Sequence, residues 1–251
     1  MDDEKLIQKI ANMLNKSKNT VVVTGAGIST EAGIPDFRGD KGIYRVLGED
    51  NVLNLLNIDT FRTNPRGFYD FYRNYFMMPK VEPSRAHLLL AEMELKGYVK
   101  AVVTQNIDNL HQAAGSKRVI AVHGNAEQFS CTKIGCYTKV DAEYVRNYTE
   151  IVPRCPKCNS ILKPDVVLFG EAIQNYRQAT DTILNSQLLI VIGSSLTVYP
   201  LAGFVSEYCV SRKDFVIINK GHTALDHAAT IKLDINHTGD ALEKIFNYLY
   251  N

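Results

Sequence analysis

The chain has 251 residues with 28 Lys and Arg against 27 Asp and Glu, a formal net charge of +1, which gives no electrostatic reason to expect a nucleic acid or an anionic membrane as a partner. Its apolar residues (45%) and charged residues (22%) lie in the ordinary globular range, which excludes wholesale disorder. Because no secretory signal opens the sequence and its longest aliphatic run, 188–192, is far shorter than the roughly 20 residues of a membrane-spanning helix, we expect a soluble protein of the cytoplasm.

Segments with helical periodicity alternate with short apolar runs along most of the chain. Residues 4–14 carry apolar side chains at helical spacing, and further helices are predicted at 86–96, 176–185, 203–211 and 239–250. The apolar runs, each a candidate strand, lie at 20–24, 101–104, 119–122, 188–192, 215–218 and 229–233. Their apolar residues are largely continuous rather than alternating, which is typical of strands buried on both faces.

This alternation predicts an α/β fold with a doubly wound parallel, Rossmann-like sheet. Two inserts interrupt it: residues 40–80, rich in Tyr, Phe and Asn, are expected to form short helices and loops, and residues 131–163 carry four of the five cysteines. We therefore expect a large dinucleotide-binding domain made of 1–39, 81–130 and 164–251. The small domain is expected to combine the helical insert 40–80 with the cysteine module 131–163.

Small and polar residues follow five of the predicted strands. In chain order these segments are Gly25-Ala-Gly-Ile-Ser29, Gln105-Asn-Ile-Asp108, His123-Gly-Asn125, Gly193-Ser-Ser195 and Asn219-Lys220. Ligands of open parallel sheets bind beyond the carboxyl ends of the strands, so we expect these segments to meet at one binding edge. Loops are polar in general, which explains any one of these segments but explains all five together poorly.

The glycines of Gly25-Ala26-Gly27 have the context of a pyrophosphate-binding turn, after a strand and before a helix-like stretch. Small residues let backbone N–H groups approach a diphosphate. Thr30 stands where the usual dinucleotide fingerprint has its third glycine, and no acidic residue clearly ends the second strand. A plain dehydrogenase is therefore disfavoured, and the motif alone is also compatible with a simple tight turn.

Four cysteines form two pairs, Cys131-x4-Cys136 and Cys155-x2-Cys158, with 18 residues between the pairs. This spacing is typical of a tetrahedral zinc site, and four thiolates leave no open position, so the zinc is expected to be structural. Unliganded or disulfide-bonded cysteines are the disfavoured alternative in a reducing compartment. Cys209 stands apart and is expected to be a small buried apolar residue.

The string Gly25-Ala-Gly-Ile-Ser-Thr-Glu-Ala-Gly-Ile-Pro-Asp-Phe-Arg-Gly39, with the segments 104–111, 123–125 and 193–195 and the four cysteines, resembles the sirtuin family of NAD-dependent protein deacylases. The resemblance extends in order from about residue 4 to 248. It implies that nicotinamide leaves NAD and that the acyl group of an acyl-lysine passes to ADP-ribose, with free lysine and O-acetyl-ADP-ribose as the other products. The implied co-substrate is NAD, and the implied partner is acylated lysine in a protein or peptide.

The resemblance also implies which residues contact NAD. The diphosphate would be held by Gly25, Ala26, Gly27 and Thr30. A mobile cofactor loop would contain Asp36, with Phe37 shielding the ribose carbon and Arg38 reaching a phosphate. The nicotinamide and its ribose would be contacted by Gln105, Asn106, Ile107 and Asp108. The adenosine side would be formed by Gly193, Ser194, Ser195, Asn219, Lys220 and Asn236.

Catalysis is implied for His123, Asn106 and Asp108. His123 would be the general base, because an imidazole with an ordinary pKa of about 6.5 is suited to remove a ribose hydroxyl proton near neutral pH. A single histidine after a buried strand is otherwise most often structural. The neighbouring Gly124-Asn125 and the resemblance favour the base, whereas His111 is expected to pack or to form hydrogen bonds.

The acyl-lysine channel is implied to contain Val167, Phe169, Gly170 and Val198. An extended peptide would add as a strand between these segments, so that backbone hydrogen bonds supply affinity with little sequence preference. Family members that remove succinyl or malonyl groups carry a Tyr and an Arg two positions apart, whereas Tyr44 and Arg45 are adjacent here. This departure favours neutral acyl groups, acetyl above all.

Two other functions are alternatives to a deacetylase. A protein mono-ADP-ribosyltransferase is the alternative of related chemistry, and the acyl channel together with His123 argues against it. A non-catalytic NAD- or ADP-ribose-binding module is the alternative from another class, and it would predict loss of His123, Asn106 or Asp108. All three are present, so the sequence predicts an enzyme.

Overall fold

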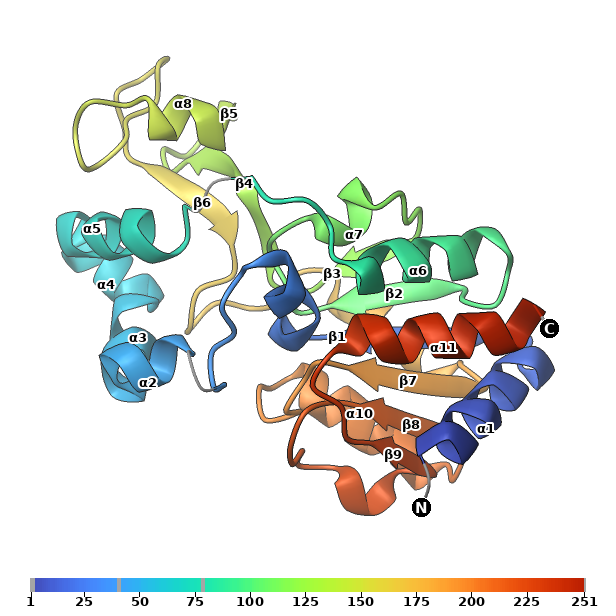
Figure 1. Ribbon diagram of the computed structural model, residues 1–251. Coiled ribbons are helices and arrows are strands. Elements are labelled where there is room, and N and C mark those ends of the chain that lie inside the picture. Colours follow the sequence, from blue (N-terminus) through green and yellow to red (C-terminus); the bar gives the residue numbers. More distant parts are fainter. Residues whose placement is uncertain (1–2, 40–41, 78–79, 251) are drawn as a thin grey trace.

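The computed structural model describes residues 3–39, 42–77 and 80–250. Its main sheet is parallel, with the strand order β3-β2-β1-β7-β8-β9 (Figure 1). The strands are β1 (Thr20–Thr24), β2 (Ala101–Thr104), β3 (Val119–Ala121), β7 (Leu188–Ile192), β8 (Asp214–Ile218) and β9 (Ile231–Leu233). The chain builds outward from β1 to β3 on one side and from β7 to β9 on the other. The predicted doubly wound sheet is confirmed, and its topological switch point lies between β1 and β7.

Helices cover both faces of this sheet. One face carries α1 (Asp3–Lys16), α6 (Arg85–Leu95) and α11 (Thr238–Tyr250), and the other carries α9 (Tyr176–Leu184) and α10 (Leu201–Val210). Successive strand residues point to opposite faces, so Val22 packs under the first set of helices while Val21 and Val23 pack under the second. Because helices bury both faces of the sheet, the strand sequences are continuous runs of apolar residues. Among the described helices none has the length and apolar character to cross a membrane.

The predicted strand at 229–233 is shorter in the structure. β9 begins at Ile231, because Ala229 ends the 3₁₀ helix η2 (Asp226–Ala228). Thr230 instead brackets the start of β8: its hydroxyl accepts from the backbone N–H of Phe215 (3.1 Å), and its own N–H donates to the Phe215 carbonyl (2.7 Å). The short α7 (Leu110–Ala113) follows β2.

A smaller lobe lies beside the main sheet (Figure 1). It contains α2 (Ile43–Leu47), α3 (Glu49–Leu55), α4 (Ile58–Thr63), α5 (Pro65–Tyr75) and α8 (Ala142–Arg146). Its antiparallel sheet has the order β5-β4-β6, formed by β4 (Gly124–Cys131), β5 (Lys139–Asp141) and β6 (Leu162–Val166). An aromatic core joins the helices of this lobe to its antiparallel sheet, with Phe68, Tyr69 and Tyr72 of α5 packed near Phe129 of β4.

Local side-chain caps start two of the short helices in the helical insert. Asn57 begins α4 by accepting from the N–H of Asp59, and Asn64 begins α5 with Pro65 in the first helical turn. Residues 40–41 and 78–79 of this insert lie outside the described residues. β4 starts at Gly124 and β6 ends at Val166, so the second sheet extends beyond the cysteines on both sides. The domain boundaries given above stay a prediction.

Candidate active site

The carboxyl ends of β1, β2, β3, β7 and β8 border a cavity of about 1170 Å³ that reaches into the smaller lobe. Every residue that the sequence predicted to contact NAD or acyl-lysine lines this cavity. The five polar segments therefore meet at one edge, as their places after parallel strands predicted. Their individual roles toward a ligand stay predictions.

The glycine turn after β1 packs directly against the turn after β7. Gly27 N–H donates to the Gly193 carbonyl (2.9 Å), and a Cβ on Gly25 would lie 2.7 Å from the same oxygen. Side chains are thus excluded where the two strand ends meet, which leaves backbone groups to face a ligand. The helix-like stretch predicted after this turn is a 3₁₀ helix, η1 (Ala26–Ala32), which ends at Gly33 with φ 92°.

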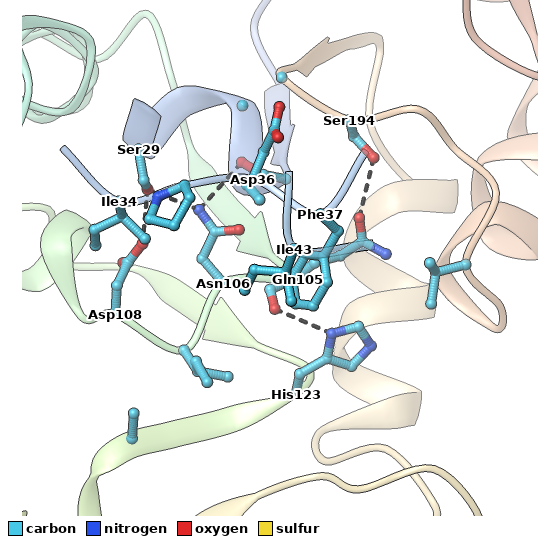
Figure 2. A pocket seen from close by; sticks show the side chains of 18 of the residues that line it. Ser29, Ile34, Asp36, Phe37, Ile43, Gln105, Asn106, Asp108, His123 and Ser194 are labelled. Carbon is cyan, nitrogen blue, oxygen red and sulfur yellow. Dashed lines mark hydrogen bonds between the residues drawn. The ribbon is translucent and has the colours of Figure 1, made fainter. Parts of the chain in front are cut away.

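A polar network connects the segments after β1 and β2 (Figure 2). The Ser29 hydroxyl donates to Asp108 Oδ2 (2.6 Å), and Asn106 Nδ2 donates to the Ser29 hydroxyl and to the Gly25 carbonyl (both 3.1 Å). The other Asp108 oxygen accepts the N–H of Leu110 (3.0 Å). The catalytic and binding assignments made from the sequence omitted Ser29. The sequence feature that marks Ser29 as a candidate is its position in Gly25-Ala-Gly-Ile-Ser29, the segment that directly follows the first predicted strand.

His123 is held by the strand end beside it (Figure 2). Its Nδ1 lies 3.0 Å from the carbonyl oxygen of Gln105. A carbonyl only accepts, so Nδ1 carries the proton and Nε2 carries the lone pair. Burial lowers the pKa of His123 below its ordinary value, although the hydrogen bond to Gln105 acts in the opposite direction. The imidazole is therefore neutral at neutral pH and able to accept a proton.

Gly124 is required by the close approach of β6 behind His123. It has φ 85°, and a Cβ would lie 2.1 Å from the carbonyl oxygen of Asp165. The neighbouring N–H of Val167 donates to the His123 carbonyl (2.8 Å). This contact joins the histidine to the segment predicted to bind acyl-lysine.

Two other histidines lie buried behind the network. His111 bonds to the Thr24 hydroxyl (2.9 Å), His87 bonds to the Ser84 hydroxyl (2.7 Å), and their ring centroids are 4.7 Å apart. Burial lowers the pKa of His87 to about 4 and that of His111 to about 3. Neither is among the described residues that line the cavity. His111 thus packs and forms a hydrogen bond, as expected.

Residues of the predicted cofactor loop make several contacts within the chain. Asp36 accepts the N–H of Gly39 (2.8 Å), and the Phe37 ring lies 5.4 Å from that of Tyr44. Arg38, predicted to reach a phosphate, is paired with Glu49 (3.0 Å) and lies over the Tyr44 ring. A phosphate would have to compete with the Glu49 carboxylate for this guanidinium.

The predicted acyl-lysine residues come from two segments. Val167, Phe169 and Gly170 lie in the turn after β6, and Val198 lies before α10. The turn is attached to the smaller lobe, because Phe169 N–H donates to the Leu56 carbonyl and the Phe169 carbonyl accepts from Ile58 N–H (both 3.0 Å). Tyr44 lines the cavity, whereas Arg45 is outside the set of described lining residues.

The four paired cysteines come together in the smaller lobe. Their sulfur atoms all lie within 4.8 Å of one another, with Cys131 and Cys158 at 3.4 Å and Cys136 and Cys155 at 3.8 Å. Tetrahedral zinc with Zn–S bonds of 2.3 Å requires sulfur separations of roughly 3.8 Å, so the cluster fits the ion. Cys209 is partly buried beside the core of the main sheet.

Comparison with known proteins gives a consistent result. The sequence profile described as the Sir2 family matches residues 25–200. The chain is 43% identical over 235 residues to an NAD-dependent protein deacetylase of Thermotoga maritima. The aligned region covers 92% of this chain and 93% of the relative. A solved Sir2 complex with a deacetylated p53 peptide and 3′-O-acetyl-ADP-ribose has a TM-score of 0.89 and 40% identity, and covers 96% of this chain and 97% of that chain. A structure of Sir2Tm bound to a propionylated peptide has a TM-score of 0.83 and 40% identity, and covers 94% and 96%.

Proposed function

Because this chain belongs to the Sir2 family, we infer that the cavity is the active site of an NAD-dependent protein-lysine deacetylase. The enzyme transfers the acyl group of acyl-lysine to ADP-ribose and releases nicotinamide and O-acetyl-ADP-ribose. The observation that carries this function is the convergence on one cavity of the glycine turn, the neutral His123 and the turn after β6. No observation favours the ADP-ribosyltransferase alternative.

NAD supplies the nicotinamide leaving group and the ADP-ribose acceptor. We propose that the backbone of Gly25, Ala26 and Gly27 with Thr30 binds the diphosphate, where the glycines keep side chains out of the way. Ser194 and Asn219 suit the adenosine ribose, because an uncharged hydroxyl and an amide bond to sugar hydroxyls without requiring a charge. Asp108, oriented by Ser29, would hold the nicotinamide carboxamide.

His123 is proposed as the general base. Its lone pair is on Nε2, because Nδ1 donates to Gln105, and its lowered pKa keeps that lone pair free at neutral pH. It would take the proton of a ribose hydroxyl, which makes the oxygen a better nucleophile. Asn106 would face the same ribose while its amide remains bonded to Ser29 and Gly25.

The peptide is proposed to bind as an extended strand between the turn after β6 and the segment that contains Val198. Val167 and Phe169 would flank the acyl-lysine, and Gly170 would let the peptide backbone approach. Neutral acyl groups, acetyl above all, are proposed as substrates. The peptide bound by Sir2Tm carries a propionyl group, which is an uncharged acyl group of this kind.

Zinc is proposed as a structural ion held by Cys131, Cys136, Cys155 and Cys158. The close sulfur atoms support this proposal. Because four thiolates fill a tetrahedral shell, the ion would stabilise the smaller lobe and take no part in the reaction. The division into a large NAD-binding domain and a small domain with the boundaries given above is part of the same proposal.

The function is tested by mass spectrometry of an acetyl-lysine peptide incubated with the purified protein, with and without NAD. We expect loss of the acetyl group only with NAD, together with formation of O-acetyl-ADP-ribose. A peptide that keeps its acetyl group while the protein gains ADP-ribose would identify a transferase instead. No consumption of NAD would contradict both enzymes.

A further inference from the structure

Lys163 on β6 and Glu171 close the turn that carries the proposed acyl-lysine residues. Lys163 Nζ lies 2.9 Å from Glu171 Oε2 and also donates to the carbonyl oxygens of Val166 (2.9 Å) and Pro164 (3.2 Å). Each of the three ammonium protons therefore has an acceptor. The lysine side chain is 19% exposed and the glutamate side chain 28%, so water screens this pair less than it screens a surface pair.

Glu171 completes the closure from the other end of the turn. Its Oε2 also accepts the N–H of Leu168 (2.9 Å), and its own N–H donates to the Leu168 carbonyl (3.0 Å). A single carboxylate oxygen thus receives both the ammonium group and a backbone N–H. Gly170, between these residues, has φ 89°, a conformation that a side chain would strain.

The closed turn is joined to both sides of the cavity. Val167 N–H donates to the His123 carbonyl, and the Phe169 backbone pairs with Leu56 and Ile58 of the smaller lobe. Val167, Phe169 and Gly170 line the cavity between these attachments. A change in the conformation of the turn would therefore move the proposed wall of the acyl-lysine channel, whereas the glycine turn after β1 would be unaffected.

We propose that Lys163 and Glu171 are positioning residues that hold the 166–171 turn in the conformation that binds acyl-lysine. This inference rests on the proposed function. Removal of the ammonium group leaves a partly buried carboxylate without its cation and leaves the Val166 and Pro164 carbonyls without their side-chain donor, so the closed conformation loses part of its advantage over others.

The first test is Lys163→Met, which keeps an unbranched apolar stem and removes the charge. We expect the KM for an acetyl-lysine peptide to rise about ten-fold, the size expected for the loss of a charged hydrogen bond. The KM for NAD should stay within about two-fold. Lys163→Arg should recover most of the peptide affinity, because a guanidinium also pairs with a carboxylate.

The matched control is Lys139→Met. Lys139 of β5 pairs at 3.3 Å with Asp165 of β6, the strand that also carries Lys163. Its side chain is 60% exposed, and among the described residues its side-chain bond goes to Asp165 and not to the 166–171 turn. Glu171→Gln is the second variant, because the amide oxygen keeps an acceptor for Leu168 N–H while the charge is lost. Glu171→Gln should raise the peptide KM by about three-fold. The double variant Lys163→Met/Glu171→Gln should raise it by less than the product of the two single effects.

Two results would overturn the positioning role: an unchanged peptide KM in Lys163→Met, or equal rises in the KM for peptide and for NAD in both variants. Purely additive single effects would also contradict a direct coupling of the two side chains. If the unaltered enzyme fails to deacetylate with NAD, the proposed function fails instead, so the two failures are distinguishable.

Discussion

The carbonyl oxygen of Gln105 lies 3.0 Å from Nδ1 of His123 and fixes the tautomer of the imidazole. The donor and acceptor come from the ends of neighbouring parallel strands, β2 and β3. Gln105 is fixed in turn by its side chain, because its Oε1 accepts from the Ser194 hydroxyl (3.0 Å). The proton-accepting nitrogen of the proposed base is thus set by a backbone contact that no substitution of the Gln105 side chain removes directly.

His123→Ala removes the proposed base. We expect turnover of an acetyl-lysine peptide to fall about 10²-fold or more, while thermal stability and zinc content stay unchanged. His227→Ala, at a histidine outside the described lining of the cavity, is the control and should keep full activity. Retention of more than a few per cent of turnover in His123→Ala would falsify the assignment of the base.

The pH dependence of the reaction follows from the lowered pKa of His123. The base must be neutral to act, and burial shifts its protonation to lower pH than that of an ordinary histidine at about 6.5. We therefore expect kcat/KM for the peptide to hold as the pH falls to about 6.5 and to decline only below it. A decline centred above that value in a steady-state pH profile would contradict the buried, neutral imidazole.

Ser29→Ala removes the hydroxyl that donates to Asp108 at 2.6 Å. Because a hydrogen bond to a charged group is lost next to the proposed nicotinamide pocket, kcat/KM for NAD should fall about ten-fold. Ser186→Ala is the matched control, since Ser186 is equally buried and bonds to the Ile183 carbonyl before the amino end of β7, outside the described lining of the cavity. It should lower the unfolding temperature without changing the kinetics toward NAD. Equal kinetic effects in the two variants would refute the role of Ser29.

Cys155→Ser tests the zinc site. Loss of one of four thiolates should reduce bound zinc and lower the unfolding temperature together, by about 10 °C if several kcal/mol of metal binding energy are lost. Cys209→Ser should leave the zinc content intact, because Cys209 lies outside the sulfur cluster. Metal analysis and thermal unfolding of both variants decide the matter, and a stable, zinc-free Cys155→Ser protein is the result that the structural role does not allow.

The buried histidines predict a loss of stability in mild acid. The unfolded chain takes up protons on histidine near pH 6.5, whereas folded His87 and His111 do so only near 4 and 3. The unfolded state therefore binds more protons within this window, so the free energy of unfolding contains the full contribution above about pH 6.5 and falls as the pH drops toward 4.

His111→Gln isolates one of these groups, because an amide keeps a donor for Thr24 but does not titrate. Between pH 7 and 5 the loss in free energy of unfolding should be about 2 kcal/mol smaller than in the unaltered protein. Urea denaturation at both pH values measures this difference. If His111→Gln shows the same pH dependence as the unaltered protein, the argument from burial is wrong.

The sequence alone was sufficient to predict the main sheet and the set of residues that lie at its edge. Continuous apolar runs such as Leu188–Ile192 are stable only when both faces are covered, which requires helices above and below a parallel sheet. Residues that directly follow such strands must then emerge at one edge. The meeting of His123 with the segments around Gly25 and Gly193 follows from that rule and from no knowledge of their side-chain contacts.

Only the tertiary structure determined how those residues are held. The bond from Ser29 to Asp108 joins residues 79 positions apart, and Arg38 is paired with Glu49, with which a phosphate would have to compete. The closure of the 166–171 turn by Lys163 depends equally on a distance that a linear pattern does not contain. Periodicity reports which face of an element is buried. The partner of a polar side chain is instead chosen by the packing of distant segments, because a hydrogen bond forms only within about 3 Å and in the right direction.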